Sequence, residues 1–159
     1  MGQSTDAMLV YGYNLGGEED WELEGLGECG ELPDLPWYDA DDGDDDFQGA
    51  AERRLLAEIA GFSETWSSEN EGYFDRERAA KARLGVEFDT HCSGDYPMFL
   101  LATKVITVYR GSVKDIDMAA LAVEPETNGW NEKLRAAVQA LGITPKQERP
   151  QWLLCSYWG

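Results

Sequence analysis

No lysine or arginine occurs in the first third of this 159-residue chain. Residues 1–51 hold fifteen Asp and Glu residues, whereas the remaining residues hold sixteen acids and all thirteen bases. The net charge of −18 therefore comes almost entirely from one region. A field of this kind repels nucleic acid and anionic membranes and attracts basic surfaces. We therefore expect no direct binding to nucleic acid or membrane, and a protein partner with a basic, nucleic-acid-binding surface.

Cysteines and long apolar runs are also scarce. The three cysteines, Cys29, Cys92 and Cys155, are widely separated and have no CxxC spacing, which indicates neither a disulfide framework nor a zinc site. No long uninterrupted apolar run occurs, and the N-terminal residues lack the basic flank and apolar centre of a signal peptide. We expect a protein of a reducing cytoplasm.

The usual catalytic and cofactor signatures are missing as well. There is no GxGxxG leading into a helix and no GxxxxGK[ST] phosphate loop. His91 is the only histidine, and it stands beside Cys92 with Asp95 close behind. Neighbouring residues of a strand point to opposite faces, so His91 is badly placed to activate Cys92 as a nucleophile. We expect no enzymatic activity, no catalytic residue and no cofactor.

The acidic run at residues 39–46 invites a calcium interpretation, because hard cations bind clustered carboxylates. Aligning Gly43 with the glycine of an EF-hand loop places Tyr38 and Ala40 at the first two ligand positions and Gly49 at the last. The motif therefore fails, and we predict no metal site. The run is read first as a solvated charged segment, then as a protein-binding face, and last as a weak divalent-ion site.

Length and composition predict a single domain spanning residues 1–159, since 43% of the residues are apolar and 11% are aromatic. Asn14 to Gly17 has the composition of a turn. Period-2 and β-rich segments predict strands, and apolar stripes with capping residues predict helices. The predicted strands are residues 7–13, 86–92, 98–109 and 151–158, and the predicted helices are residues 49–62, 75–84, 117–123 and 128–141.

This order predicts an α+β fold of the ferredoxin-like (split βαβ) type. It has an antiparallel sheet, helices on one face, and a long acidic insertion after the first strand, at about residues 14–48. The last strand should lie at an edge, yet it is apolar on both faces, and exposed edges of that kind promote association. Either the aromatic residues of the insertion or a partner chain should cover it, and we favour the insertion.

The acidic insertion also contains large aromatic residues of the kind that anchor interfaces. The four bases of the predicted helix 75–84, Arg76, Arg78, Lys81 and Arg83, are candidate partners for it, and a contact with residues 39–46 would neutralise the surface internally. The candidate partner-binding residues are Glu18, Glu19, Asp20, Trp21, Glu22, Trp37, Tyr38, Asp39, Asp41, Asp42, Asp44, Asp45 and Asp46.

The segments MGQSTDAMLVYGYNLGG and PQWLLCSYWG resemble the termini of small acidic accessory proteins of unassigned function from phages of actinobacteria. The resemblance covers only these two segments. It implies an accessory protein made in the cytoplasm of a bacterial host, and it carries no known site, cofactor or activity.

Two functions follow as hypotheses. In the first, the acidic face docks on the basic surface of a host protein and excludes DNA or RNA by occupancy or mimicry. In the second, the protein is a structural or assembly component that associates through its apolar C-terminal strand, with a homo-oligomer as one outcome.

Overall fold

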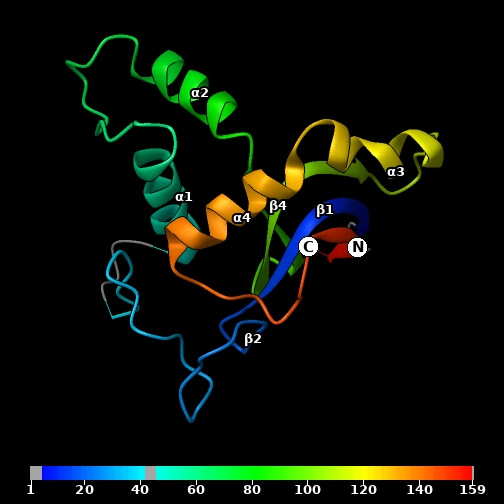
Figure 1. Ribbon diagram of the computed structural model, residues 1–159, viewed down its shortest axis with the longest axis horizontal. Coiled ribbons are helices and arrows are strands. Elements are labelled where there is room, and N and C mark those ends of the chain that lie inside the picture. The colour runs from blue at the N-terminus through cyan, green and yellow to red at the C-terminus, as the bar shows by residue number, and fades with distance from the viewer. Residues whose placement is uncertain (1–4, 42–45, 159) are drawn as a thin grey trace.

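The computed structural model describes residues 5–41 and 46–158, which form a mixed α+β fold with a five-stranded sheet and four helices (Figure 1). The strands are β1 (Thr5–Gly17), β2 (Asp20–Trp21), β3 (Glu87–Ser93), β4 (Pro97–Val108) and β5 (Gln151–Trp158). The helices are α1 (Phe47–Glu58), α2 (Tyr73–Leu84), α3 (Met118–Thr127) and α4 (Trp130–Leu141).

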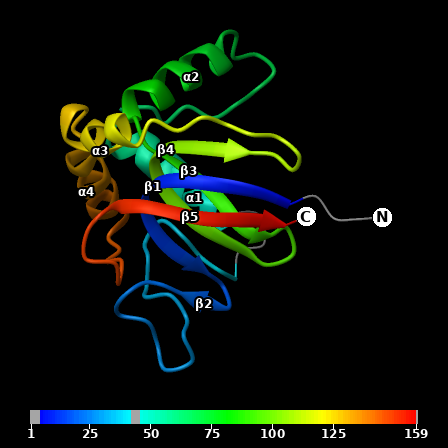
Figure 2. The same cartoon turned by 90° about the vertical axis from the view of Figure 1, so that its right-hand side faces the viewer.

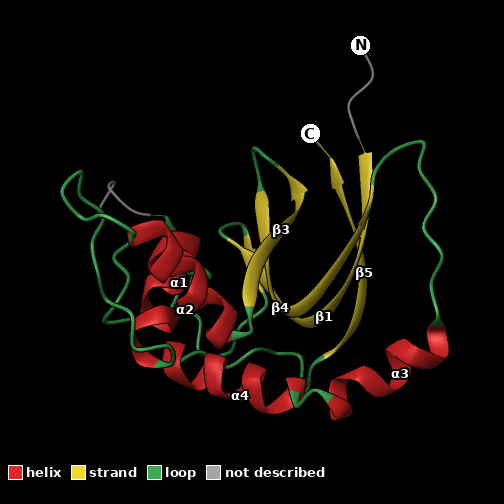
Figure 3. Cartoon of the chain, turned by 90° about the horizontal axis from the view of Figure 1, so that it is seen from above, coloured by secondary structure: helices red, strands yellow, loops and turns green. Residues whose placement is uncertain are grey.

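The four long strands pair with one another in a ring. β1 lies between β4 and β5 and is antiparallel to both, and β3 is antiparallel to β4 on the other side. At their C-terminal ends β3 and β5 meet in parallel, with Cys92 opposite Tyr157 and Ser93 opposite Trp158. The sheet must therefore curl, and Figure 3 shows the strands bending round with the helices gathered outside them.

The two faces of the sheet bury separate cores, because successive side chains of a strand point to opposite sides. Tyr11, Tyr13 and Leu15 of β1 face the helices and belong to a large core that includes residues of α1, α2 and α4. Met8 and Val10 point the other way and are buried with residues of β4. No described helix residue belongs to this inner core, so the curvature of the sheet itself must exclude water from it.

Local capping explains where three of the helices begin or end. The Asp46 carboxylate accepts a hydrogen bond of 2.7 Å from Gly49 N and so starts α1. Gly142, the residue after the predicted helix 128–141, ends α4 in the left-handed conformation. Asn128, the first residue of the predicted helix 128–141, instead ends α3, where its side-chain amide donates to Glu124 O. Asp75, the first residue of the predicted helix 75–84, lies inside the first turn of α2, which begins at Tyr73.

The predicted turn at residues 14–17 is wrong, because β1 continues through Gly17. Asn14 Oδ1 accepts a hydrogen bond from Gly16 N at 3.1 Å, and the pairing with β4 shifts register at this point. Gly16 takes a φ of 71°, which a glycine tolerates. The polar and glycine residues therefore form a bulge within the strand, and the chain reverses only after it, at Glu18 and Glu19.

The expectation that the acidic insertion covers the last strand is also wrong. β5 pairs along its length with β1, and Trp152 packs against Tyr11 and Trp130, with ring centroids 5.3 and 6.1 Å away. Leu154 and Trp158 remain 80% and 51% exposed. Trp21 packs instead against Phe47 of α1 and Phe99 near the start of β4. Figure 2 shows the backbone that follows β2 looping beyond β2, away from β5.

Candidate functional site

The aromatic residues of the predicted partner-binding surface fasten the acidic segment, residues 18–46, to the rest of the domain. Trp21 is 4% exposed, and its ring lies 4.8 Å from that of Phe47. Trp37 Nε1 donates a 2.8 Å hydrogen bond to Leu141 O at the end of α4. Tyr38 packs edge-on against Phe47. Trp21 is therefore a core residue rather than an exposed anchor, and Trp37 and Tyr38 are half-buried.

Most of the described carboxylates of the segment are exposed around these anchors. Glu18, Asp39 and Asp46 come from different parts of the segment, yet all three act on one phenol. Burial raises the pKa of Tyr38, and the charges of Glu18, Asp46 and Asp39 raise it further. The fold therefore gathers negative charge that is dispersed in the sequence. Glu19, Asp20 and Asp41 are exposed as well, whereas Asp42, Asp44 and Asp45 lie outside the described residues.

A cavity of about 260 Å³ lies between the β1–β2 turn and the β3–β4 turn. Glu18, Glu19 and Asp20 line one side, and Asp95 and Tyr96 line the other. Sequence reasoning missed the second side as part of this surface. The two turns meet because β1 pairs with β4 in a register that places Gly16 opposite Phe99, and no local pattern predicts such a register.

The bases of α2 are engaged away from the acidic segment. Arg76 Nη2 lies 2.7 Å from Glu64 Oε2, and this bond holds the pKa of Glu64 at about 2. Arg78 pairs with Asp75 at 3.0 Å. Lys81 pairs with Glu77 and with Glu52 of α1, and Arg83 donates to Ala60 O. Among the described residues, none of these bases forms an ion pair with residues 18–41 or with Asp46.

One lysine from outside does reach the segment. Lys146 Nζ donates to Trp21 O at 3.0 Å and lies 3.9 Å from the carboxylate of Glu22. Glu22 is therefore the one predicted partner-binding acid that, within the described parts of the chain, carries an ion pair. The remaining described candidates, Glu18, Glu19, Asp20, Asp39, Asp41 and Asp46, form no ion pair with any other described residue.

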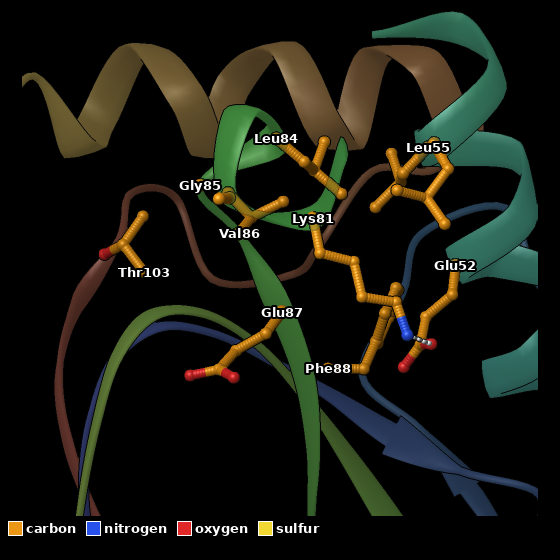
Figure 4. Close-up of a pocket in the computed structure, with 11 residues that line it drawn as sticks. Glu52, Leu55, Lys81, Leu84, Gly85, Val86, Glu87, Phe88 and Thr103 are labelled. Carbon is orange, nitrogen blue, oxygen red and sulfur yellow. Dashed lines mark ion pairs between the residues drawn. The ribbon is translucent and has the colours of Figure 1, made fainter. Parts of the chain in front are cut away.

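A second cavity, of about 360 Å³, lies between α1, the end of α2 and the start of β3 (Figure 4). Leu55, Leu84 and Phe88 give it an apolar floor, and the Lys81–Glu52 pair spans one side. Figure 4 shows the Glu87 carboxylate directed away from that pair. Burial raises the pKa of Glu87, and the charges of Asp89 and Glu52 raise it further.

His91 and Cys92 have different environments. Burial lowers the pKa of His91, whose Nε2 is enclosed and has no hydrogen-bond partner within the described residues. Cys92 is exposed and has a positive φ of 72°. All three cysteines are free. Across residues 5–41 and 46–158, no three acidic, histidine or cysteine side chains are arranged to hold a metal ion.

Comparison with known proteins gave no relative: no family model, no curated protein and no solved structure matches this chain. Among the helices of the described residues, none is long and apolar enough to cross a membrane.

Proposed function

We propose that this chain is an interaction protein whose acidic surface binds a basic surface of another protein and acts by occupancy. The acidic surface consists of the exposed carboxylates of Glu18, Glu19, Asp20, Asp39, Asp41, Asp46 and Asp95. The observation that carries the proposal is that these carboxylates form no ion pair within the described residues, while buried aromatic rings hold the backbone beneath them.

Anchoring matters because binding a loose acidic tail requires the tail to become ordered, and that ordering opposes binding. Trp21 and Trp37 of the acidic segment pack on Phe47 of α1, so the described backbone around these two residues is already held in place. Carboxylates held at fixed spacings can replace the phosphates that a nucleic-acid-binding surface normally contacts. The cavity between Asp20 and Asp95 offers room for a lysine or arginine side chain of such a partner.

The resemblance to accessory proteins of actinobacterial phages suggests the setting of this interaction. We infer that the partner is a nucleic-acid-binding protein of the bacterial host, met in the cytoplasm. Excluding DNA or RNA from such a protein requires neither a catalytic residue nor a cofactor.

We also interpret the architecture as a strongly curled variant of the ferredoxin-like fold. The strand order β5-β1-β4-β3 supports this interpretation, as do the helical connections from β1 to β3 and from β4 to β5. The parallel contact between β3 and β5 is an addition to the split βαβ plan.

Affinity capture from a bacterial lysate tests the proposal. The bait is the intact chain, compared with a variant in which Glu18, Glu19, Asp20 and Asp95 are changed to their amides. A control variant carries the same charge change at four exposed acids elsewhere: Glu69, Glu71, Asp115 and Glu126. We expect the intact and control chains to hold a nucleic-acid-binding protein at low salt, and DNA or RNA to displace it. Equal retention by all three chains, or retention by none, would refute the proposal.

Exposed apolar residues favour a second function, assembly through the last strand. Leu154 and Trp158 of β5 are largely exposed, and so is Met118 of α3, at 68%. A second copy of the chain could cover them. Sedimentation of the intact chain and of Leu154→Lys tests this: a dimer that dissociates on substitution supports assembly, and a monomer at all concentrations excludes it.

A further inference from the structure

Two arginines line a third cavity, so its charged side chains are positive although the protein as a whole is strongly negative. The cavity has a volume of about 480 Å³ and is built where β1, α4 and the start of β5 come together. Arg135 comes from α4 and Arg149 from the loop before β5. The other lining residues are Tyr11, Asn131, Pro150, Gln151 and Trp152.

Neither guanidinium has a carboxylate partner among the described residues. Within the described residues, the side chains of Arg135 and Arg149 form no hydrogen bond and no ion pair, although the chain contains thirty-one acids. Other bases do find carboxylates: Arg54 pairs with Glu58 and Lys104 with Glu124. Two unpaired arginines beside one cavity create a local positive potential in a strongly negative protein.

The charges of the two arginines act on two tyrosines of β1, Tyr11 and Tyr13. Burial raises the pKa of Tyr11, while its hydrogen bond to Asn131 and the charge of Arg149 act in the opposite direction. Burial likewise raises the pKa of Tyr13, and the charge of Arg135 opposes it. Both charges therefore reach the same stretch of β1.

The walls of the cavity are held in place from both sides. Gln147 donates from Nε2 to Gly12 O at 2.9 Å and to Arg149 O at 2.7 Å, and its Oε1 accepts from Asn14 N. The loop that carries Arg149 is thus tied to β1. On the other wall, the Tyr11 hydroxyl donates to Asn131 Oδ1 at 2.7 Å, which leaves the Asn131 amide nitrogen as a donor.

We propose that this cavity binds a small molecule with an oxyanion group, a carboxylate or a phosphate, carried on an aromatic body. Guanidinium groups match the geometry of both oxyanions, and the amides of Asn131 and Gln151 add donors. The Trp152 indole and Pro150 supply apolar surface for the body of the ligand. The volume lies within the usual range for small-molecule sites, about 300–1,000 Å³. This site is independent of the acidic surface.

Titration of the isotope-labelled full chain, followed by nuclear magnetic resonance, tests the proposal with three probes. Phenyl phosphate and benzoate carry the two oxyanions on the same ring, and benzylamine carries a cation instead. We expect saturable shifts of the Asn131, Gln151 and Trp152 signals with at least one oxyanion and none with benzylamine. The oxyanion that binds identifies the preferred group.

Matched variants locate the site. Arg135→Gln and Arg149→Gln should each weaken binding about tenfold, because each removes charged hydrogen bonds to the ligand. Lys133→Gln makes the same charge change on α4 outside the cavity and should alter binding by less than about twofold. Because all three side chains are exposed, the variants should fold normally. Absence of saturable shifts with both oxyanions, equal binding of benzylamine, or an equal loss in Lys133→Gln would overturn the proposal.

Discussion

The acidic segment and α2 carry net charges of opposite sign, and the fold treats the two regions in opposite ways. The bases of α2 are matched by nearby acids, as Arg76 is by Glu64 and Lys81 by Glu77 and Glu52. Most described acids of the segment have no such match, and the segment is held instead by rings packed on Phe47. The bases of α2 are neutralised by neighbouring acids, whereas the described acids of the segment are displayed on the surface.

This difference means that, in the acidic segment, the carboxylates set the surface charge and the aromatic rings supply most of the stability. Exposed ion pairs such as Arg78–Asp75 contribute little to the free energy of unfolding, and a buried ring contributes several kilocalories per mole. Substitutions that remove charge from the segment should therefore leave it folded, whereas substitutions of its rings should not.

The largest effect is expected for Trp21→Ala. The substitution removes a ring that stacks on Phe99 at 5.9 Å and contacts Phe47, so it should lower the free energy of unfolding by about 3–5 kcal/mol. Denaturant unfolding of the purified chain measures this. Trp66→Ala, at a tryptophan that is 57% exposed in the connection before α2, is the control and should cost no more than about 0.5 kcal/mol. Similar losses in both would mean that the acidic segment is not held by its rings.

A smaller effect on the free energy of unfolding is expected at Asp46, where two substitutions distinguish the helix-capping role of the side chain from its charge. Because Asp46 Oδ1 accepts from Gly49 N at the start of α1, Asp46→Ala should lower the free energy of unfolding by about 1 kcal/mol. Asparagine caps helices about as well as aspartate, so Asp46→Asn should be nearly neutral while still removing the charge. Thermal unfolding of both variants checks this, and equal destabilisation by the two would show that the charge itself stabilises α1.

The smallest effect concerns Glu87, whose pKa is raised in the folded state by burial and by the charges of Asp89 and Glu52. Ionising this carboxyl therefore opposes folding, and the loss of stability develops as pH rises from the ordinary glutamate range, near about 4.3, towards the raised pKa. Glu87→Gln removes this loss. It should raise the free energy of unfolding at pH 7 by at most about 0.5 kcal/mol and have no such effect below about pH 3.

Denaturant unfolding at both pH values measures the Glu87 effect. Glu69→Gln, the same change at an exposed acid, is the control. A gain that persists in acid, or that appears equally in the control, would contradict the assignment to Glu87.

Elements governed by local pattern could be predicted from the sequence. The strand predicted at residues 151–158 coincides with β5, and the last helix ends at Leu141 as its apolar stripe and the following Gly142 indicate. The strand predicted at 98–109 differs from β4 by a single residue at each end. In each of these segments the side-chain period and the terminal residues indicate the same structure.

Features that depend on distant pairing could not be predicted. Asn14 to Gly17 looks like a turn because its composition is that of a turn, and only the register with β4 turns it into a bulge. Aromatic residues that fix a loop to the protein's own core are of the same types as aromatic residues that bind a partner protein. The sequence alone therefore does not distinguish the two roles. Asp95 joins Glu18 and Asp20 only through the meeting of two turns that are far apart in the sequence.

The antiparallel pairing of β1 with β5 also sets how the molecule would respond to a pulling force. Thr5 lies opposite Trp158 at one end of this pairing, and Gly12 lies opposite Gln151 at the other. A force applied through these two strand ends therefore loads the hydrogen bonds one pair after another, as in opening a zipper, rather than all together in shear. The β1–β5 pairing should therefore open from Thr5 and Trp158 towards Gly12 and Gln151. Each step breaks only the next hydrogen-bonded pair, so the force needed should be low at every step.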